Sequence, residues 1–579
     1  MNILGLSCFY HDAAACLLMD GIPVAASDEQ AFTRKKHDSD FPAQAIRYCL
    51  REAGIRADQI DAVAFYDKPL MKFDRLLRYQ VHHFPSTFKT FVDAMPRWIA
   101  TRLRLNKLLK DEFDYTGPVL YSEHHLSHAA SAYYTSGFDK AAVLTVDGVG
   151  EWATASWGRG EGPNLELLGE IKFPHSLGML YSAFTYYCGF KVNSAEYKLM
   201  GLAPYGEPTM VDRVREFIDV KHDGSFRLNM QYFAYEQGTG MFNERFEEVM
   251  GRPRRPLESK EMETHYKDAA RSIQEVTNDV MIKLARSTMK RAGSKNLCMA
   301  GGVALNCVAN GHILRETGVE DIYIQPSAGD AGGAMGAAYV VWNQLLQNPV
   351  GPRLPTPYLG PGYSEEEIRE TLDRHGAVYK RLEREELVTH VAELIDTAHV
   401  VGWYQSRREW GPRALGHRTI LGDARHPEMR TIINMRIKFR EGFRPFAPTC
   451  LEEHVQDYFE IDRPSPYMLL VAPVKEEHRE GLKAITHVDG SARIQTVNRE
   501  QEPLYYDLIK AFHERTGCPI VINTSLNVRG EPIVTTPEDS YLCFMRTNMD
   551  AMALGPFLCM KEDQPELELK SAAEEFGLD

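Results

Sequence analysis

Three histidines occur within five residues in the stretch SEHHLSHAASAYY, residues 122–134. His124 and His128 are four positions apart, so on a helix they share one face with their Cβ atoms about 6 Å apart. This separation suits two imidazole ligands on one metal ion, whereas His125 points off that face. His125 also stands where a zinc-protease helix has its glutamate, so the hydrolytic base of that motif is missing. On spacing alone, a plain polar helix face is the commoner explanation.

Two aspartates add weight to the metal interpretation. Asp147 ends the apolar run VLTVD and begins a glycine turn, and Asp330 lies in the turn SAGDAGGAMG. Carboxylates at strand ends followed by glycines stand where a backbone can approach phosphate or metal, although a plain Asp–Gly turn explains each one singly. With His124 and His128 they form a mixed nitrogen and oxygen donor set. Such a set suits Fe(II), Mn(II) or Zn(II), and the sequence does not choose among them.

Two glycine-rich turns, DGVGE and AGGVALN, follow predicted apolar strands. Such turns offer backbone N–H groups to phosphate, and the start of a following helix adds its dipole. Neither turn is a P-loop, because no Gly-Lys-Ser/Thr follows, and a tight turn without a ligand explains each alone. Lys198 lies in AEYKLMGLAPYG, whose tail we expect to be a loop, where most lysines are solvated. The candidate nucleotide-binding residues are Gly148, Gly150, Lys198, Gly301, Gly302 and Asn306.

The segment 405–445 carries the clearest charge anomaly of the second half of the chain. It holds ten Lys/Arg and four Asp/Glu, in a protein whose net charge is −14. A solvated basic face would explain the charge, but WGPRALGHR and FRPFAP interleave arginines with Gly, Pro and aromatic residues, a poor composition for a free helix surface. Arginine binds phosphate or carboxylate through two parallel hydrogen bonds. We therefore predict a pocket for a small polyanion, which Arg493 and Arg529 could join.

The bulk composition limits the class of protein. At 579 residues the chain is too long for one core, and two to four domains are expected. A net charge of −14 argues against a general nucleic-acid binder. The first residues lack the basic region of a signal peptide, no apolar run is long enough to span a membrane, and ten scattered cysteines without a C-x-x-C pair indicate reduced thiols. These features predict a cytoplasmic protein that is bound to no membrane.

The order of predicted elements indicates an α/β protein. A strand–turn–strand unit at 1–27 is echoed at 141–158, and a late glycine turn follows, which is typical of the duplicated fold of sugar kinases, actin and heat-shock ATPases. The Pro/Gly-rich stretch 351–363 predicts a linker between a first domain, 1–350, and a second, 364–579. Residues 68–115 are basic, aromatic and mostly helical, and we interpret them as an insertion or a lid of unassigned role.

Several long motifs in chain order carry a family resemblance. They are FYHDAAACLL, HHLSHAASAYY, VLTVDGVGEWATAS, EYKLMGLAPYG, GGVALN, GDAGGAMGAA, WGPRALGHRTIL, FREGFRPFAP and NTSLNVRGEPIV. Together they resemble the O-carbamoyltransferase family of NodU, CmcH and TobZ over nearly the whole chain. The resemblance implies an N-terminal TsaD-like domain with the actin/sugar-kinase fold and a C-terminal YrdC-like α/β domain.

The resemblance also implies a two-step reaction. Carbamoyl phosphate and ATP, the latter with Mg, form carbamoyl-adenylate in the YrdC-like domain, and the TsaD-like domain transfers the carbamoyl group to a hydroxyl of a small natural product or sugar. The implied metal, typically iron, with manganese or zinc as alternatives, is held by His124, His128, Asp147 and Asp330. The implied catalytic residues are His11 and Lys36, with Lys35 as an alternative register. The implied carbamoyl phosphate-binding residues are Arg413, Lys438, Arg444, Arg493 and Arg529.

Two other functions fit parts of this pattern. A fused threonylcarbamoyl-adenosine enzyme acting on tRNA would share both domain types. The net charge disfavours it, whereas the basic stretch 68–110 favours it. A nucleotide-gated binding protein of the heat-shock type would leave the His/Asp set and the arginines unexplained. The identity of the acceptor and the oligomeric state do not follow from the sequence.

Overall fold

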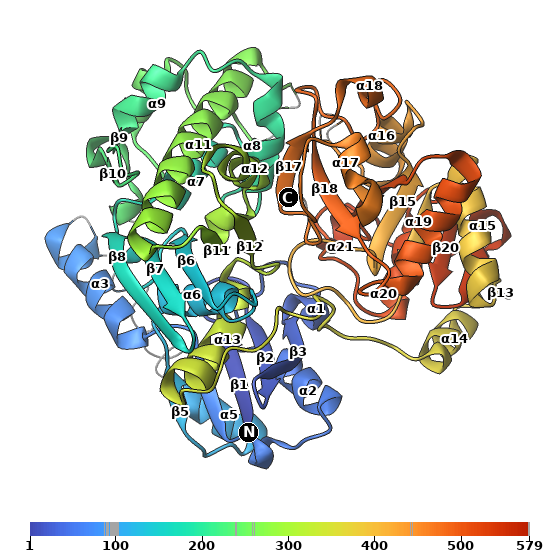
Figure 1. Ribbon diagram of the computed structural model, residues 1–579, viewed down its shortest axis with the longest axis horizontal. Helices are drawn as coiled ribbons and strands as arrows, with labels where there is room; N and C mark the ends of the chain where they lie inside the picture. The colour runs from blue at the N-terminus through green and yellow to red at the C-terminus, as the bar shows by residue number, and fades with distance from the viewer. Residues whose placement is uncertain are drawn as a thin grey trace. The chain divides into compact units, whose positions relative to one another are not determined.

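The computed structural model describes residues 1–576 except 86, 89–91, 93–103, 238–239, 258, 260, 441 and 443. The chain forms two compact units (Figure 1). The first unit comprises Met1–Glu29 and His37–Leu354, and the second comprises Gln30–Lys36 and Pro355–Asp579. The division at Leu354 lies inside the stretch expected to be a linker. The second unit also takes in Gln30–Lys36, which the sequence placed in the first domain.

The first unit contains two five-stranded sheets of the same topology. Their orders are β3-β2-β1-β4-β5 and β8-β7-β6-β11-β12, and in each the first three strands in sequence pair antiparallel while the last two add in parallel. The strands are β1 Asn2–Ser7, β2 Ala14–Met19, β3 Ile22–Asp28, β4 Ala62–Phe65, β5 Val119–Tyr121, β6 Lys140–Val146, β7 Ala153–Glu161, β8 Asn164–Lys172, β11 Asn296–Ala300 and β12 Asp321–Ile324. This repetition confirms the duplicated actin/sugar-kinase architecture, and the echo seen in two strands extends to five.

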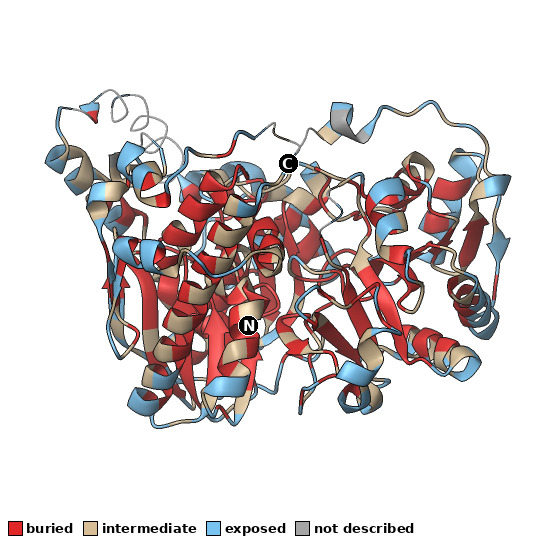
Figure 2. Ribbon diagram, turned by 90° about the horizontal axis from the view of Figure 1, so that it is seen from above, coloured by how far each residue is buried: buried red, intermediate tan, exposed pale blue. Residues whose placement is uncertain are grey.

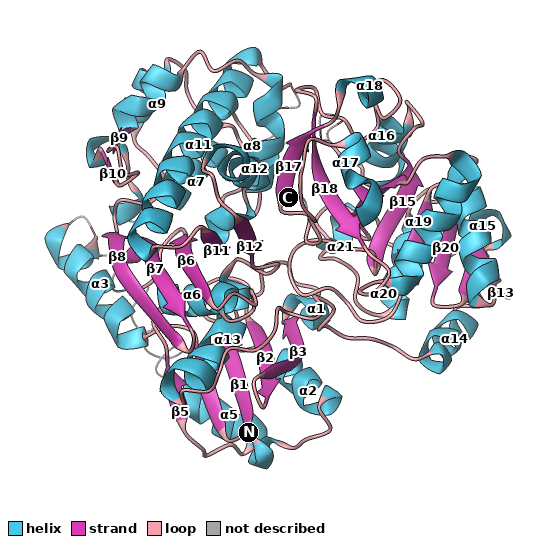
Figure 3. Ribbon diagram, viewed as in Figure 1, coloured by secondary structure: helices cyan, strands magenta, loops and turns pink. Residues whose placement is uncertain are grey.

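Helices flank both sheets of the first unit (Figure 3). They are α2 Ala43–Glu52, α3 Pro69–His82, α5 Leu105–Phe113, α6 His124–Tyr133, α7 Leu177–Tyr187, α8 Glu196–Leu202, α9 Val211–Phe217, α10 Glu244–Met250, α11 Thr264–Ala292, α12 Cys307–Glu316 and α13 Asp330–Tyr339, and a small hairpin joins β9 Ile218–Val220 to β10 Phe226–Leu228. In the segment 68–115 the described parts are mainly the helices α3 and α5; residues 86, 89–91 and 93–103 of that segment lie outside the described residues.

Helices α6 and α13 pack against each other, and nearly all of their residues are buried. Figure 2 shows buried residues in red. A Cβ atom on Gly336 of α13 would lie 1.8 Å from the carbonyl oxygen of Ser127 on α6, and a Cβ on Gly5 of β1 would lie 1.9 Å from the carbonyl oxygen of Ala334. Only glycine allows backbones this close. The small residues of the GDAGGAMGAA motif thus set α13 tightly between β1 and α6.

The second unit is built on one mixed nine-stranded sheet, which confirms the expected α/β class. Its order is β13-β21-β20-β14-β15-β19-β16-β18-β17, with strands β13 Lys380–Arg381, β14 Val401–Tyr404, β15 Arg418–Asp423, β16 Ala447–Leu451, β17 Leu470–Pro473, β18 Ser491–Val497, β19 Ile520–Ser525, β20 Ala551–Leu554 and β21 Phe557–Met560. The helices are α1 Gln30–Thr33, α14 Glu365–Arg374, α15 Arg384–Asp396, α16 Met429–Ile432, α17 Val455–Tyr458, α18 Glu476–Arg479, α19 Pro503–Thr516, α20 Pro537–Arg546 and α21 Ala572–Phe576.

Arg34 explains why Gln30–Lys36 belongs to the second unit. Its guanidinium donates to the carboxylate of Glu531 at 2.8 Å and to the carbonyl oxygens of Pro532 and Ile533 at 3.0 and 2.9 Å, and it lies 3.4 Å from the carboxylate of Asp539. Glu531 is buried and needs a cation nearby, so the short segment is fixed to the loop that follows β19.

All ten cysteines are buried and free of disulfide bonds. Among the described residues, no helix is both long and apolar enough to cross a membrane.

Candidate functional site

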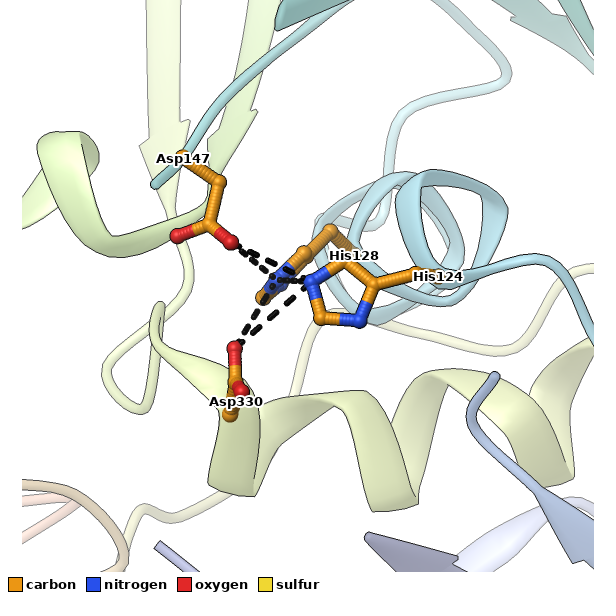
Figure 4. A group of neighbouring side chains, drawn as sticks. All are labelled: His124, His128, Asp147 and Asp330. Atoms are coloured by element: carbon orange, nitrogen blue, oxygen red, sulfur yellow. Dashed lines mark hydrogen bonds and ion pairs between the residues drawn. The ribbon is translucent and has the colours of Figure 1, made fainter. Parts of the chain in front are cut away.

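His124, His128, Asp147 and Asp330 converge in the interior of the first unit (Figure 4). The Nε2 atom of His124 lies 3.1 Å from Nε2 of His128, 3.2 Å from Oδ2 of Asp147 and 3.6 Å from Oδ1 of Asp330. The Nε2 atom of His128 lies 3.8 Å from the same oxygen of Asp147 and 3.6 Å from that of Asp330. All four side chains are buried. The sequence-predicted ligand set is therefore one spatial cluster that could hold a metal ion.

The distances within this cluster and one unpaired carboxylate oxygen fit a metal. Bonds of about 2.1 Å to one ion place neighbouring ligand atoms about 3.0–3.4 Å apart. The separations above are close to that, and both imidazoles present the same nitrogen to the centre. Oδ2 of Asp330 is buried and has no hydrogen-bond partner within the described chain. Two imidazoles and two carboxylates suit iron, manganese or zinc, and the geometry alone does not select one.

Each residue of the cluster has a position that local structure dictates. The two histidines occupy the first and second turns of α6, and Asp147 directly follows β6. Asp330 is the first residue of α13, where the positive end of the helix dipole stabilises its negative charge. The other oxygen of Asp147 accepts a hydrogen bond from the backbone N–H of Gly302 at 2.8 Å. This bond ties the end of β6 to the glycine turn after β11.

Glu151 is a further residue of the site that the sequence did not point out. Its carboxylate accepts the backbone N–H of His124 at 3.0 and 3.1 Å and that of Lys68 at 2.8 Å. A carboxylate at this place accepts a hydrogen bond from an amide at the start of α6 that has no partner within the helix. Its negative charge also interacts favourably with the positive end of the helix dipole. Glu151 therefore fixes the helix turn that carries the two histidines. The clue in the sequence is the acidic residue that closes the turn DGVGE.

Neighbouring charges within the cluster shift the pKa values of Asp147 and His124. Burial raises the pKa of the Asp147 carboxyl, but its hydrogen bond to His124 and the charges of His128 and His124 outweigh this and hold the pKa well below its usual range. Burial lowers the pKa of His124, and the Asp330 and Asp147 carboxylates more than reverse this, so the net shift is upward. Asp147 is thus kept ionised, as a metal-binding carboxylate must be.

His125 contacts the sheet beside α6 and not the centre of the cluster. Its Nδ1 atom lies 2.8 Å from the hydroxyl of Thr145 on β6 and 3.1 Å from that of Ser156 on β7. Burial, and then the charge of His124, lower its pKa well below the ordinary value. A neutral imidazole joining α6 to the sheet matches the expectation that this histidine points away from the ligand face.

The candidate nucleotide-binding glycines have steric roles of their own. A Cβ on Gly150 would lie 3.0 Å from ring carbons of both His124 and His125, and a Cβ on Gly301, whose φ is +92°, would lie 2.3 Å from the carbonyl oxygen of Val146. Gly148 has no such neighbour. These turns are therefore shaped by packing around the cluster as well as by any ligand.

The other two candidates for nucleotide binding lie at the start of a helix and within one. Asn306 caps α12 by accepting the N–H of Ala309 at 3.1 Å and exchanges hydrogen bonds with Gln274. The expectation of a loop at Lys198 is wrong, because this residue lies in α8, and its side chain is buried and not solvated.

His11 and Lys36, the two predicted catalytic residues, fall in different units. His11 lies in the turn after β1, 2.7 Å from the carboxylate of Asp12, and Lys36 follows the anchored Arg34 in the second unit. The His11–Asp12 contact also involves His37, which was not singled out from the sequence.

Several basic residues of 405–445 serve the second unit itself. Arg418 is fully buried and donates to the carbonyl oxygens of Ser406 and Pro361 at 3.0 and 3.1 Å. Arg407 donates to the carbonyl oxygen of Leu359 at 2.7 Å, and Arg425 pairs with Asp423. These residues account for part of the local charge without any ligand.

The five predicted carbamoyl phosphate-binding residues lie on neighbouring strands or the loops next to them. Arg413 lies between β14 and β15, Lys438 and Arg444 between α16 and β16, Arg493 on β18, and Arg529 after β19; β15, β19, β16 and β18 are adjacent in the sheet. The Lys438 ammonium donates to Asn527 through its side chain at 2.8 Å and its carbonyl at 3.0 Å, and also to Ser525. Burial, and then Arg440 and Arg444, lower its pKa. Lys438 thus holds the loop that carries Arg529.

A buried amide network holds the loop of Arg413 in the same region. The Gln495 side chain donates to the carbonyl oxygen of Leu415 at 2.6 Å and accepts from Asn523 at 2.7 Å, and Asn523 also donates to the carbonyl oxygen of Ala414 at 3.1 Å. Gln495 lies two residues from Arg493 on β18, so both side chains face the same side of the sheet. Sequence reasoning missed both amides.

Known proteins match the chain over most of its length. Residues 2–339 match the family model for the carbamoyltransferase N-terminus, and residues 392–561 that for the carbamoyltransferase C-terminus. The uncharacterized protein sll1178 of Synechocystis sp. is 51% identical, with full coverage of both chains. Nodulation protein NolNO of Sinorhizobium fredii is 37% identical over 96% of this chain and 79% of its own, and nodulation protein NolO of Bradyrhizobium diazoefficiens is 38% identical over 76% and 78%. The chain therefore belongs to the carbamoyltransferase family and is a carbamoyltransferase enzyme.

Proposed function

We propose that this enzyme is an ATP-dependent O-carbamoyltransferase with two separate catalytic centres. The second unit, around 364–579, forms carbamoyl-adenylate from carbamoyl phosphate and ATP, with Mg accompanying the nucleotide. The first, around 1–350, transfers the carbamoyl group to a hydroxyl of a small natural product or sugar. The observation that carries the proposal is the buried His124/His128/Asp147/Asp330 cluster occurring in a carbamoyltransferase chain whose other unit carries a set of arginines.

In the second unit, the arginines bind the reactants. Arg413, Arg444, Arg493 and Arg529 are the proposed contacts to carbamoyl phosphate, where guanidinium groups neutralise the phosphate and present paired N–H donors. Lys438 acts through the Arg529 loop, because its three protons are directed at Ser525 and Asn527. Water cleaves carbamoyl phosphate to carbamate and inorganic phosphate. A carbamate oxygen then attacks the α-phosphorus of ATP, and pyrophosphate leaves.

In the first unit, the carbamoyl carbon must accept an alcohol. A carbamoyl group is a poor electrophile because its nitrogen donates into the carbonyl, and adenylation supplies a better leaving group. The cluster would hold an ion, iron in preference to manganese or zinc, which supplies positive charge to the phosphate as AMP departs. The glycine turns at 148–150 and 301–302, with Asn306 and Lys198, are the proposed surroundings of the nucleotide. Burial of the cluster excludes water, which would otherwise hydrolyse the adenylate.

The test separates the two steps. Metal-loaded enzyme is given ATP and carbamoyl phosphate, and pyrophosphate and carbamoyl-adenylate are measured. Neither product forming would refute the proposal. His128→Ala removes one ligand, so it should abolish carbamoyl transfer and lower metal content while pyrophosphate formation continues. The matched control is His265→Ala, also in the first unit, whose ring contacts the hydroxyl of Tyr187 away from the cluster. Loss of both activities in His128→Ala would contradict the two-centre division.

The acceptor is proposed as a small hydroxylated molecule in the cytoplasm and not as tRNA, since the chain is acidic overall. A tRNA-binding titration at moderate salt distinguishes the two, and a panel of hydroxylated metabolites, including sugars and aminoglycosides, identifies the acceptor class.

A further inference from the structure

A second group of polar side chains lies in the first unit beside the His/Asp cluster. The carboxylate of Asp12 bridges two imidazoles: Oδ2 lies 2.7 Å from Nδ1 of His11, and Oδ1 lies 2.8 Å from Nδ1 of His37. The two rings are 4.8 Å apart between centroids. The remaining nitrogens face the carbonyl oxygen of Asn193 and the hydroxyl of Ser194. One carboxylate thus fixes the orientation of both histidines.

The partners of His11 determine its charge. Nδ1 faces a carboxylate oxygen and Nε2 faces the Asn193 carbonyl oxygen at 2.9 Å. Both partners only accept hydrogen bonds, so both ring nitrogens must carry a proton, and the ring is an imidazolium. Burial lowers the pKa of His11, but the Asp12 hydrogen bond and charge, and the more distant Asp330, raise it to about 10. An imidazolium has no lone pair with which to take a proton from an alcohol.

The partners of His37 favour a different state. Its Nδ1 also faces the Asp12 carboxylate and therefore carries a proton. Its Nε2 lies 3.3 Å from the Ser194 hydroxyl, which can donate a hydrogen bond to an unprotonated nitrogen. In a serine–histidine–aspartate triad, a carboxylate accepts the Nδ1–H of the histidine and Nε2 of the same ring faces a hydroxyl. His37 has the same arrangement of partners. In His37 the Nε2 atom thus faces a hydroxyl, as the proton-accepting nitrogen of such a base does.

The backbone of this group is unusually constrained. Asp12, His37 and Asn193 all have left-handed φ values, +44°, +55° and +61°. Residues other than glycine adopt this region at a cost, and such residues gather at functional sites where the surrounding structure enforces them.

We propose that His37 is the base of the carbamoyl-transfer step, that Asp12 is a positioning residue for it, and that His11 acts as a fixed cation. This inference rests on the proposed transfer in the first unit. The acceptor hydroxyl takes the place now held by the Ser194 hydroxyl. Its proton moves to Nε2 of His37 as its oxygen bonds to the carbamoyl carbon. The bond from that carbon to the adenylate phosphate oxygen breaks, and AMP leaves with the electron pair.

Two nucleophiles test this assignment in one enzyme. Carbamoyl-adenylate is generated in place from ATP and carbamoyl phosphate, and AMP release is followed with methanol or with hydroxylamine, an amine that attacks without prior loss of a proton. The variant is His37→Asn, because Asn tolerates the left-handed backbone. A missing base costs about 100-fold or more, so methanol-dependent AMP release should fall by about that factor. Hydroxylamine-dependent release should stay within about threefold, and His265→Asn should change neither.

The outcomes are separable. Pyrophosphate formation that persists in His37→Asn shows a folded second unit and an intact first step, whereas its absence in the wild-type enzyme refutes the proposed function itself. An equal fall with both nucleophiles would indicate a structural effect and overturn the proposal, as would no fall with methanol. Restoration of methanol-dependent release in His37→Gly by added imidazole would support it.

A measurement without an acceptor tests the charge states. The histidines of the protein are labelled with nitrogen-15, and NMR spectra are recorded at pH 7.5. Comparison with the spectra of His11→Asn and His37→Asn assigns the signals of the two rings. The proposal requires protons on both nitrogens of His11 and on Nδ1 alone of His37. A neutral His11 or a doubly protonated His37 would overturn it.

Discussion

Replacement of Arg34 by alanine tests whether a segment near the N-terminus is part of the second unit. Arg34 is the cation that contacts Glu531, whose side chain is only 1% exposed, and it also binds the carbonyl oxygens of Pro532 and Ile533. Alanine leaves a buried carboxylate without its counter-charge. We expect the second unit to lose stability while the first does not.

The size of the effect follows from the burial. Removing one partner of a fully buried ion pair costs about 3–5 kcal/mol. Arg34 is 18% exposed, so water partly replaces it, and we expect the low end, about 3 kcal/mol. With a urea slope of about 3 kcal/mol/M, the midpoint for the second unit should fall by about 1 M. Arg34→Lys should recover only part of this, because an ammonium cannot reproduce the planar fork of contacts.

Hydrogen exchange at increasing urea, read by mass spectrometry, follows the two units separately. Peptides from β19 and α20 report the second unit, and peptides from β6 and β11 report the first. A double-mutant cycle with Glu531→Gln isolates the pair, because Gln still accepts from the Val528 N–H but carries no charge. We expect a coupling free energy of about 2 kcal/mol.

The pH dependence of the stability loss in Arg34→Ala gives a further test. Burial raises the pKa of Glu531 and the Arg34 charge opposes this, so Arg34→Ala raises the pKa further. A protonated carboxyl needs no cation, and the loss of stability should therefore be smaller at pH 5.5 than at pH 8. A coupling energy below about 0.5 kcal/mol, or a larger loss at the lower pH, would refute the reasoning.

Three further outcomes are expected. Gly150→Ala pushes a methyl group against the rings of His124 and His125, so metal affinity in a competition titration should fall about tenfold or more, and an unchanged affinity would contradict the packing argument. Gln495→Ala frees the loop that carries Arg413, so the KM for carbamoyl phosphate in the pyrophosphate assay should rise about tenfold without a change in metal content. Because the pKa of His125 is lowered in the folded state, metal-free protein should lose stability as the pH falls below about 6.5, and His125→Asn should make this fall shallower; equal slopes would argue against a buried neutral ring.

Local patterns in the sequence were sufficient to predict the α/β class and the four members of the His/Asp cluster. The four-residue spacing of His124 and His128 places them on one face wherever a helix forms, and Asp147 and Asp330 mark the points where a strand ends or a helix begins. These are properties of neighbouring residues, so they can be recognised before any fold is known. Lys198 shows the limit: glycine and proline nearby suggested a loop, whereas packing buries this residue in α8.

Only the tertiary structure revealed the residues that support those side chains. Glu151 at the start of α6, His37 on Asp12, and the Gln495 and Asn523 amides under the arginine loop each act across many residues of sequence. The sequence by itself determined which residue types were available and which shared a local face. The tertiary structure decided their partners, because contacts between distant segments depend on how whole helices and sheets pack, and no local periodicity records that.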